Sequence, residues 1–471
     1  MKTHSNDLNA TQLKHNRIAF GLGTIGRDMV YAMVSMFLMF YLTDILKLSN
    51  NMILQITTVI FFARIFDALN DPIMGTVVDN TRTRWGKFKL WIILGALLSG
   101  VLTVLLFTDF GFTGVKFVVF FSVIYVAWGI AYTVNDIAYW SMLPSLSQSQ
   151  KEREKLGSLA RIFANIGLFT VVVGIDPITR AIATSLENSG IGADAALSKA
   201  YMLFALAIVI VLWIFQAITV FGVKEPKRTS TNSADKTSTN LRGMITAIFK
   251  NDQLLSVALS MTLFMTGYTT TTNFGLYFFK YVYGEQGMYS IFAAVLGVSQ
   301  LLSLSLFSVL SKKWTRNQLY TAGTIGVAIG YILFFFSPMN MIPIGVAGLF
   351  IFFSQALIQL LTLVFLADTV EYGQWKLGKR NESITFSLQP FIYKLGAAIA
   401  SGVTGIVVVA SGMNTAISSA DMTQDGLLLI KIAMFIFPLI MFVCSFIVYK
   451  TTFKIDTAFF NRILEDLKNR D

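Results

Sequence analysis

The sequence predicts an all-α membrane protein with twelve transmembrane helices. Of its 471 residues, 55% are hydrophobic, 14% are aromatic and only 13% are charged, and the mean hydropathy is +0.64. Soluble domains carry about 25% charged residues, so the composition excludes an ordinary soluble protein. Residues 1–16 are polar and lack an apolar core, so we expect no cleavable signal peptide.

Apolar segments of about 20 residues are long enough to cross a bilayer as helices. The segments that meet this requirement are 18–45, 50–78, 90–108, 115–143, 160–178, 200–222, 254–279, 288–311, 319–337, 342–370, 384–410 and 427–449.

The net charge of +11 would point to nucleic acid in a soluble chain, but the positive-inside rule explains it better here. With both termini in the cytoplasm, about 27 of the 37 Lys and Arg lie in cytoplasmic segments and about six in external ones. The opposite topology would reverse this bias. We therefore expect a multi-pass protein of the plasma membrane with both ends cytoplasmic.

One clear linker divides the spans into six plus six. Residues 224–243 (KEPKRTSTNSADKTSTNLRG) are rich in Ser, Thr and Lys. Two six-helix halves form the architecture of the major facilitator superfamily. No residue-level repeat between the halves is evident, so this prediction rests on the number of spans and the place of the linker. The expected divisions are a tail 1–17, halves 18–223 and 244–451, and a tail 452–471.

The C-terminal tail predicts a short amphipathic helix at the cytoplasmic surface. Phe460, Ile463, Leu464 and Leu467 follow the i, i+3, i+4, i+7 pattern of one helix face. A structural role is more frequent for such a helix than a functional one.

The sequence offers little for catalysis. The single cysteine, Cys444, excludes an internal disulfide and a cysteine metal cluster, and the two histidines, His4 and His15, lie in the polar N-terminal tail. No catalytic pair, metal-ligand set or nucleotide-binding loop is evident. We expect neither an enzyme nor a cofactor other than a coupling ion.

The second span carries charges that a membrane helix does not usually hold. Arg64, Asp67, Asn70 and Asp71 fall within about a third of the helix circumference. Each charge costs roughly 2.5–3.5 kcal/mol at the bilayer centre, so the three charges cost about 8–10 kcal/mol before pairing. This cost favours a stripe that faces a polar cavity.

Two carboxylates one helical turn apart can bind a cation. Asp67 and Asp71, with the amide oxygen of Asn70, suit Na⁺, and neighbouring carboxylates also take up H⁺ readily. The alternative is a buried structural pair in which Arg64 neutralises Asp67. Because there are two carboxylates for one arginine, we favour the cation site.

The fourth span holds a second polar group. Tyr132, Asp136 and Trp140 share one helix face, and Thr133 is near enough to serve the cation instead. An aromatic ring beside a carboxylate is a usual arrangement for binding sugars, because the ring stacks on the sugar and the carboxylate accepts hydrogen bonds from hydroxyls. Core packing would explain the aromatic residues alone, but not the buried carboxylate.

Three further spans contain charged residues. Asp28, next to Arg27 in the first span, and Arg161 in the fifth can complete a ring of hydrogen bonds round a polyol, although an interhelical salt bridge explains them equally well. Lys394 in the eleventh span, with Gln389 before it, is expected to face the negative cavity and to pair with Asp67 or Asp136.

Two cytoplasmic connections are candidates for gating. The stretch 75–89 contains Asp79 at a helix end together with Arg82 and Arg84, and 368–382 contains Asp368 and Glu371. Such elements can lock two halves through helix termini and salt bridges. Plain positive-inside anchoring explains the basic residues of the first stretch equally well.

Together these motifs resemble the glycoside–pentoside–hexuronide:cation symporters, the melibiose permease group, over essentially the whole chain. The matching segments, in order, are RIFDALNDPIMG, RTRWGKFK, YTVNDIAYWS, KEREKLGSLARIF, KNDQL and ADTVEYGQWKLGKRNES. The last is closest to the lactose and pentoside branch of Gram-positive bacteria. Six segments in the right order are far more specific than a single motif.

The resemblance implies symport of a glycoside with Na⁺, Li⁺ or H⁺ by alternating access in a bacterial membrane, with the lipid bilayer and a small sugar as partners, no nucleic acid, and a monomer sufficient for transport. The residues that it assigns to the cation are Asp67, Asn70, Asp71 and Thr133. The residues that it assigns to the sugar are Asp28, Asp136, Trp140 and Arg161, with Tyr132, Arg27, Gln389 and Lys394 as secondary contacts.

One position departs from the family pattern. Where melibiose permease has a tryptophan near the sugar in its tenth helix, this chain has Gln359. The exact glycoside, such as a galactoside or a xyloside, therefore stays open. Two other functions also stay open: a cation-independent sugar facilitator or exchanger, and a carrier of a non-sugar amphipathic substrate on the same fold.

Overall fold

The computed structural model describes residues 10–81, 83, 86–146, 150–224, 249–378, 382–416 and 418–469. Each of the twelve predicted spans coincides with a helix. The chain divides into two compact units, Met1–Lys236 and Thr237–Asp471. Most of the predicted linker 224–243 lies outside the described residues.

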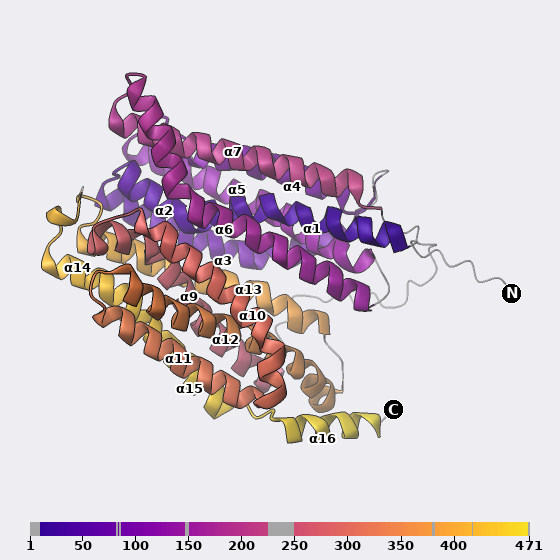
Figure 1. Ribbon diagram of the computed structural model, residues 1–471. Coiled ribbons are helices and arrows are strands. Elements are labelled where there is room, and N and C mark those ends of the chain that lie inside the picture. Colours follow the sequence, from indigo (N-terminus) through magenta and orange to yellow (C-terminus); the bar gives the residue numbers. More distant parts are fainter. Residues whose placement is uncertain are drawn as a thin grey trace. The chain divides into compact units, whose positions relative to one another are not determined.

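The N-terminal unit contains the first six spans. Its first helix passes through two π-helical segments toward its end, and the other helices are continuous. The elements are α1 (Ala10–Ala32), η1 (Met33–Phe37), α2 (Leu38–Phe40), η2 (Tyr41–Ile45), α3 (Asn50–Asn80), α4 (Lys89–Leu106), α5 (Gly114–Met142), η3 (Leu143–Ser145), α6 (Gln150–Asn188) and α7 (Ala193–Gly222). Figure 1 shows α1, α6 and α7 side by side.

Small residues let α1 approach its neighbours closely. A Cβ atom at Gly26 would collide with the backbone of Leu212 in α7. Beside this contact, Gln216 donates a 2.7 Å hydrogen bond to the carbonyl oxygen of Gly23. Close backbone approach with polar bonds across it is typical of helices in lipid, where no water satisfies polar groups. These contacts fix the helix that carries Asp28.

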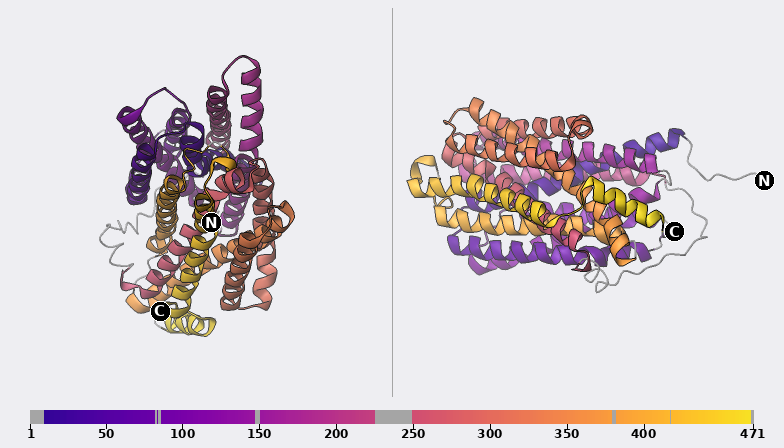
Figure 2. Two further views of the ribbon diagram at one scale, coloured as in Figure 1. Left: turned by 90° about the vertical axis from the view of Figure 1, so that its left-hand side faces the viewer. Right: turned by 90° about the horizontal axis from the view of Figure 1, so that it is seen from below.

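The C-terminal unit contains the remaining six spans and the tail helix. Its elements are α9 (Asp252–Tyr277), η4 (Phe278–Tyr283), α10 (Met288–Lys313), α11 (Arg316–Phe336), α12 (Met341–Leu377), α13 (Glu382–Ser411), η5 (Ser419–Asp421), α14 (Gln424–Lys431), η6 (Ile432–Ile436), α15 (Phe437–Thr452) and α16 (Thr457–Lys468). In the right-hand view of Figure 2 the long helices of each unit run lengthwise beside one another.

Local sequence signals explain several helix ends in this unit. Thr315 and Gln318 form a capping box at the start of α11, and the Asn340 side chain accepts a hydrogen bond at the start of α12. At the other end of α12, Gly378 takes the left-handed conformation that stops a helix.

Ten helices of the described chain are long and apolar enough to count as membrane spans by composition alone. The two predicted spans outside this group are α3 and α9. Both are nevertheless full-length helices of 31 and 26 residues.

Two helices extend well beyond their predicted spans. Helix α6 has 39 residues and α12 has 37. At a rise of 1.5 Å per residue these lengths are about 58 Å and about 55 Å, against about 30 Å of hydrocarbon. The hydropathy pattern finds only the apolar part of such a helix, because its polar ends lie in water.

The predicted tail helix is present as α16, and it packs against the end of α12. Ile463 is fully buried in a cluster with Tyr372 and Ile455. Trp375 of α12 donates a 2.9 Å hydrogen bond to Asp466. The apolar face of α16 therefore covers protein surface.

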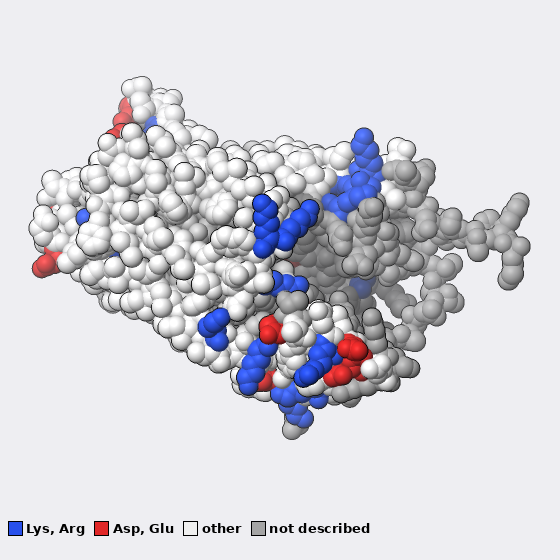
Figure 3. Space-filling model, turned by 60° about the horizontal axis from the view of Figure 1, so that its bottom comes forward, with Lys and Arg blue, Asp and Glu red and all other residues white. Residues whose placement is uncertain are grey.

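The exposed surface fits a membrane protein. The face drawn in Figure 3 is broadly uncharged, with most Lys, Arg, Asp and Glu gathered toward one end. Large apolar side chains such as Phe62, Leu98 and Ile332 are more than half exposed. Apolar exposure on this scale is expected only where lipid covers the surface.

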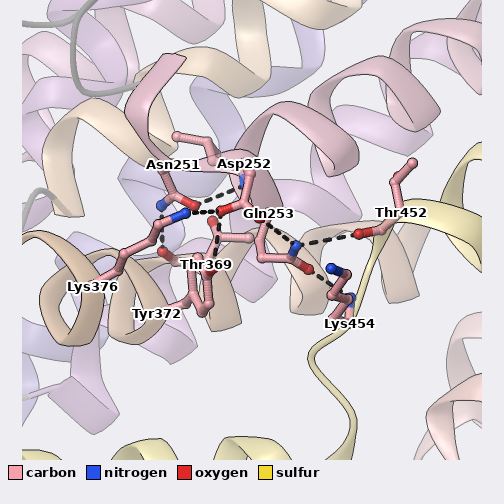
Figure 4. Close-up of polar contacts among 9 residues, drawn as sticks. Asn251, Asp252, Gln253, Thr369, Tyr372, Lys376, Thr452 and Lys454 are labelled. Atoms are coloured by element: carbon pink, nitrogen blue, oxygen red, sulfur yellow. Dashed lines mark hydrogen bonds and ion pairs between the residues drawn. The ribbon is translucent and has the colours of Figure 1, made fainter.

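Hydrogen bonds tie the start of α9 to the end of α12 (Figure 4). Asn251 donates a 2.9 Å bond to the carbonyl oxygen of Thr369. The Asp252 carboxylate, just ahead of the apolar span 254–279, accepts bonds from Lys376 (2.6 Å) and from the Tyr372 hydroxyl (2.9 Å). Partial burial would raise the pKa of Asp252, but these hydrogen bonds outweigh it and lower the pKa to about 2.

Candidate functional site

One face of α5 brings together residues of both predicted sites. Gly129, Thr133, Asp136 and Trp140 recur at steps of four, three and four residues, which places them along one side of the helix. The cation residues of α3 meet this face at one end, and Arg27 of α1 meets it at the other.

Arg27 and Asp136 form an ion pair between α1 and α5. The Arg27 side chain is only 3% exposed, whereas that of Asp136 is 34% exposed. The guanidinium group also lies 4.5 Å from the ring centroid of Tyr139 and 5.6 Å from that of Trp140. The deeply buried Arg27 is therefore placed to hold Asp136 and Trp140. The Asp136 carboxylate is the more exposed member of the ion pair.

Asp28 and Arg161 lie close to this pair. The Asp28 carboxyl is within electrostatic reach of Arg27, Asp136 and Arg161, and the Arg161 guanidinium lies 5.3 Å from the Trp140 ring centroid. Asp28 and Arg161 form no ion pair in the described chain, which argues against the interhelical salt bridge. The Oδ2 atom of Asp28 is buried without a hydrogen-bond partner. Such an acceptor is costly unless a ligand hydroxyl satisfies it.

Aromatic rings surround the same region. Tyr132 stacks on Trp128 with ring centroids 5.3 Å apart and lies 5.5 Å from Tyr31 of α1. Tyr132 is also within electrostatic reach of Arg27 and Asp136. Besides Arg27, the sequence predicts five sugar-site residues in the N-terminal unit. The structure brings all five together: Asp28, Tyr132, Asp136, Trp140 and Arg161.

The predicted cation residues also meet α5. The Thr133 hydroxyl donates a 3.4 Å hydrogen bond to Asp71. The Asp67 carboxylate lies over Gly129, where a Cβ atom would come within 2.7 Å of both carboxylate oxygens. Asn70, which lies between the two aspartates in the sequence, is half-buried. Glycine is therefore required at 129 if Asp67 is to keep this position.

Arg64 belongs to the same stripe of α3. It hydrogen-bonds Tyr125 of α5 and lies within electrostatic reach of Asp67 and Tyr31, while its Nε atom is buried without a hydrogen-bond partner. These contacts fit an internal counter-ion for Asp67 that is shared with tyrosine hydroxyls.

No group of three or more His, Cys, Asp or Glu side chains in the described chain is arranged to hold a metal ion. A Na⁺ ion at Asp67 and Asp71 would therefore take its remaining ligands from neutral oxygens, such as those of Thr133 and Asn70. The donor set suits a weakly held, exchangeable cation or a proton.

The predicted site residues of the C-terminal unit are half-buried on their helices. Gln359 lies on α12, and Gln389 and Lys394 lie on α13. Lys394 makes interactions of its own, and Asp136, one of its two predicted partners, is already paired with Arg27. Pairing of Lys394 with an N-terminal carboxylate stays a prediction.

Of the predicted gating residues, the structure describes those of the second stretch. Asp368 is 5% exposed and forms an ion pair with Arg316 of α11, inside its own unit. Glu371 is half-buried near Asp368. The side chain of Asp79, and Arg82 and Arg84 altogether, lie outside the described residues.

Several residues of the site were missed by the sequence analysis. Each of them lies either one helical turn from a predicted residue or on a helix that faces a predicted residue. They are Tyr31, Tyr125, Gly129 and Arg316. For Tyr31 and Gly129 a signal was available, since Tyr31 follows Asp28 by three residues and Gly129 precedes Thr133 by four.

Comparison with known proteins identifies relatives along nearly the whole chain. The sequence profile of the family described as MFS/sugar transport protein matches residues 19–457. The lactose permease of Lactobacillus delbrueckii subsp. bulgaricus is 34% identical over 433 residues, which cover 90% of this chain and 68% of that protein. The raffinose carrier protein of Pediococcus pentosaceus is 32% identical over 438 residues, covering 90% and 67%.

Solved structures with the same fold are more distant in sequence. The xylose transporter XylE from E. coli, in a partially occluded inward-open conformation, aligns with a TM-score of 0.61 at 13% identity and covers 95% of this chain and 99% of its own. This likeness concerns the fold alone, and the family match identifies that fold as the one of the major facilitator superfamily.

Proposed function

Since the chain belongs to the MFS/sugar transport protein family and is a membrane sugar transporter rather than an enzyme, we propose that it moves a small oligosaccharide glycoside together with Na⁺ or H⁺. The relatives named for lactose and for raffinose support a glycoside of two or three sugar units. The distribution of Lys and Arg supports both termini in the cytoplasm of a bacterial cell. A monomer contains every residue that the proposal uses.

The observation that carries this proposal is the half-open cluster of Asp28, Asp136, Trp140 and Arg161. It offers a carboxylate that is 34% exposed, an unsatisfied buried carboxylate oxygen, an exposed guanidinium group and an indole. Sugar hydroxyls donate to carboxylates and accept from arginine, and a pyranose ring packs against an indole. We assign the glycoside to this cluster.

We assign the coupling cation to Asp67 and Asp71, with Thr133 and Asn70 as neutral ligands. Helix α5 connects the two assignments, because Thr133 contacts Asp71 and Asp136 follows it by one turn. Coupling requires that each ligand bind better when the other is present, and this free energy is reciprocal. A shift of α5 caused by the cation would move Asp136 directly.

The test uses proteoliposomes and separates coupled accumulation from exchange. In the wild type, an imposed Na⁺ or H⁺ gradient should concentrate a bound glycoside, identified from a panel measured with Na⁺, with Li⁺ and at several pH values. D71C should exchange the glycoside without accumulating it. As a matched control, D194C removes a carboxylate whose side chain is 79% exposed, and it should accumulate normally.

Three outcomes would contradict the proposal. Accumulation by D71C against a gradient would remove the cation from this site. Uptake by the wild type that ignores both ion gradients would identify a facilitator or exchanger. Failure of every glycoside to bind would favour a carrier of an amphipathic substrate.

A further inference from the structure

Three contacts at regular spacing join α5 to α3, the helix of the candidate cation site. The α5 residues recur every four positions and the α3 residues every three or four, so the two helices run past one another in the same direction. The contacts are Tyr125 with Arg64, Gly129 with Asp67, and Thr133 with Asp71. The candidate cation site occupies the last two of these contacts, and Arg64 makes the first.

Two contacts join α5 to α1, the helix that carries Arg27 of the candidate glycoside site. Here the residue numbers run in opposite directions. Arg27 pairs with Asp136, and Tyr31, four residues later, packs on Tyr132, four residues earlier. The ring centroids of Tyr31 and Tyr132 are 5.5 Å apart. Tyr31 therefore lies one helical turn from the ion pair of the glycoside site.

Tyr31 links these two sets of contacts. On the cation side it is within electrostatic reach of Arg64 and of Tyr125. On the glycoside side its ring meets that of Tyr132, which is itself within electrostatic reach of Asp136. A side chain of α1 thus reaches the charged stripe of α3 directly, and the link does not pass through the backbone of α5.

Arg64 has several partners between which it is shared. It hydrogen-bonds Tyr125 and is within electrostatic reach of Asp67, while its Nε atom is buried without a hydrogen-bond partner. A buried donor without a partner is unfavourable, so an arrangement that supplies an acceptor stabilises the guanidinium group. The hydroxyl of Tyr31 is an acceptor within electrostatic reach.

We propose that Tyr31 is a positioning residue that couples the cation site to the glycoside site, through Arg64 on one side and Tyr132 on the other. This inference rests on the proposed function, which assigns the cation to Asp67 and Asp71 and the glycoside to the cluster around Asp136. It adds a second connection between the two sites to the one that α5 provides.

The coupling follows from competition for one carboxylate. The cation and Arg64 are both attracted to Asp67, so occupation of the cation site weakens the attraction between Asp67 and Arg64. The guanidinium group then shifts its hydrogen bonds toward the tyrosine hydroxyls. A hydrogen bond from Arg64 to Tyr31 fixes the Tyr31 ring, and this ring fixes Tyr132 beside the glycoside. The glycoside, by holding Tyr132, favours the same position of Arg64 and so strengthens cation binding reciprocally.

Packing alone would explain a tyrosine between helices, but another tyrosine of the same span shows what such a residue looks like. Tyr41 is 0% exposed, and its hydroxyl lies 3.2 Å from that of Ser198. Its ring is packed against Phe107 and Tyr201, with centroids 5.1 and 5.6 Å away. By contrast, Tyr31 is half-buried, and its neighbours on both sides belong to the candidate sites.

The experiment measures binding of lactose and of raffinose to purified full-length protein by isothermal titration, with and without the coupling ion. The ion is Na⁺ or H⁺, whichever strengthens binding to the wild type, and the readout is the ratio of the two dissociation constants. A ratio of about tenfold lies within the usual range of such coupling. Y31F should lower it to about twofold, while binding without the ion changes by less than about twofold.

The matched control is Y41F, which removes a tyrosine hydroxyl from the same span away from both sites and should keep the wild-type ratio. Y31L, which also removes the ring, is the second variant in case Y31F does not fold, and it should lower the ratio at least as far. A role in packing alone would lower thermal stability and leave the ratio unchanged.

The outcomes separate this inference from the function on which it rests. If the ion strengthens binding to the wild type, and Y31F keeps the wild-type ratio or loses affinity equally with and without the ion, the inference is wrong. An equal fall of the ratio in Y41F also overturns it. If the wild type binds neither sugar, or responds to neither ion, the proposed function fails and the inference fails with it. A fall confined to the Tyr31 variants supports the assignment.

Discussion

The two units use opposite chemistry in their interiors. Within the predicted spans, the N-terminal half carries Arg27, Arg64 and Arg161 together with the carboxylates of both candidate sites, whereas the basic residues within the C-terminal spans are Lys394 and, near the start of the last span, Lys431. The C-terminal interior is instead built from hydroxyls and amides, such as Tyr268 with Gln300 and Asn273 with Thr404 (3.3 Å).

This difference suggests a division of labour. Intramembrane charges are costly and are kept where they bind ions or charged partners, so the coupling chemistry is concentrated in one half. Neutral side chains cost less to hold in the membrane and can discriminate among hydroxyl patterns. The comparison predicts that charge changes in the N-terminal unit have large effects and that neutral changes in either unit have smaller ones.

The largest effect is expected from D136N. It leaves Arg27, which is 3% exposed, without its counter-ion, and an unpaired buried charge costs about 3–5 kcal/mol. Thermal unfolding should show this loss, and isothermal titration should show that glycoside binding falls by more than about 100-fold.

The double variant R27Q/D136N separates the two consequences of that change. It removes the orphaned charge, so most of the stability should return, but glycoside binding should not, because the carboxylate is still missing. Recovery of binding together with stability would show that Asp136 serves only to pair with Arg27.

A smaller effect is expected from G129A. The added methyl group would come within 2.7 Å of both Asp67 oxygens and must displace that carboxylate, a type of overpacking that costs about 1–3 kcal/mol. Stimulation of glycoside binding by the cation should therefore weaken by about tenfold, with less change in binding measured without cation. G157A is the matched control, since its Cβ would meet only Leu143 at 3.7 Å. Equal cation stimulation in G129A and the wild type would place the cation away from Asp67.

Much of the fold and of the charged site could be predicted from the sequence. Charges at Asp67 and Asp71 in an apolar span require a polar environment, and this energetic argument needs no partner to be known. The partners themselves depend on contacts between distant helices. Nothing in the local pattern distinguishes an Arg27 that holds Asp136 from an Arg27 that contacts sugar, or shows that Gly129 makes room for a carboxylate.

One feature repeated in the two halves escaped for a related reason. In each unit an amide side chain near the start of the first helix bonds the backbone at the end of the sixth span: Asn16 bonds Lys224, and Gln253 bonds Thr452 and Lys454. What the halves share is a hydrogen-bond geometry, and Asn and Gln reach equivalent backbone groups with side chains of different length. A search for identical residues therefore finds no signal that rises above the common apolar background.

The smallest effects test whether that repeat is energetic as well as geometric. Each amide makes two bonds to the end of its unit's sixth span, with distances of 2.8 and 3.0 Å for Asn16 and 3.2 and 2.6 Å for Gln253. N16A and Q253A should each lower the free energy of unfolding by about 1–2 kcal/mol, and T451A, which removes an exposed hydroxyl near the same end of α15, should stay within about 0.5 kcal/mol. Because the two amides lie in different units, the effects should add in the double variant. A loss seen in only one of the single variants would mean that the shared geometry stabilises one half and is incidental in the other.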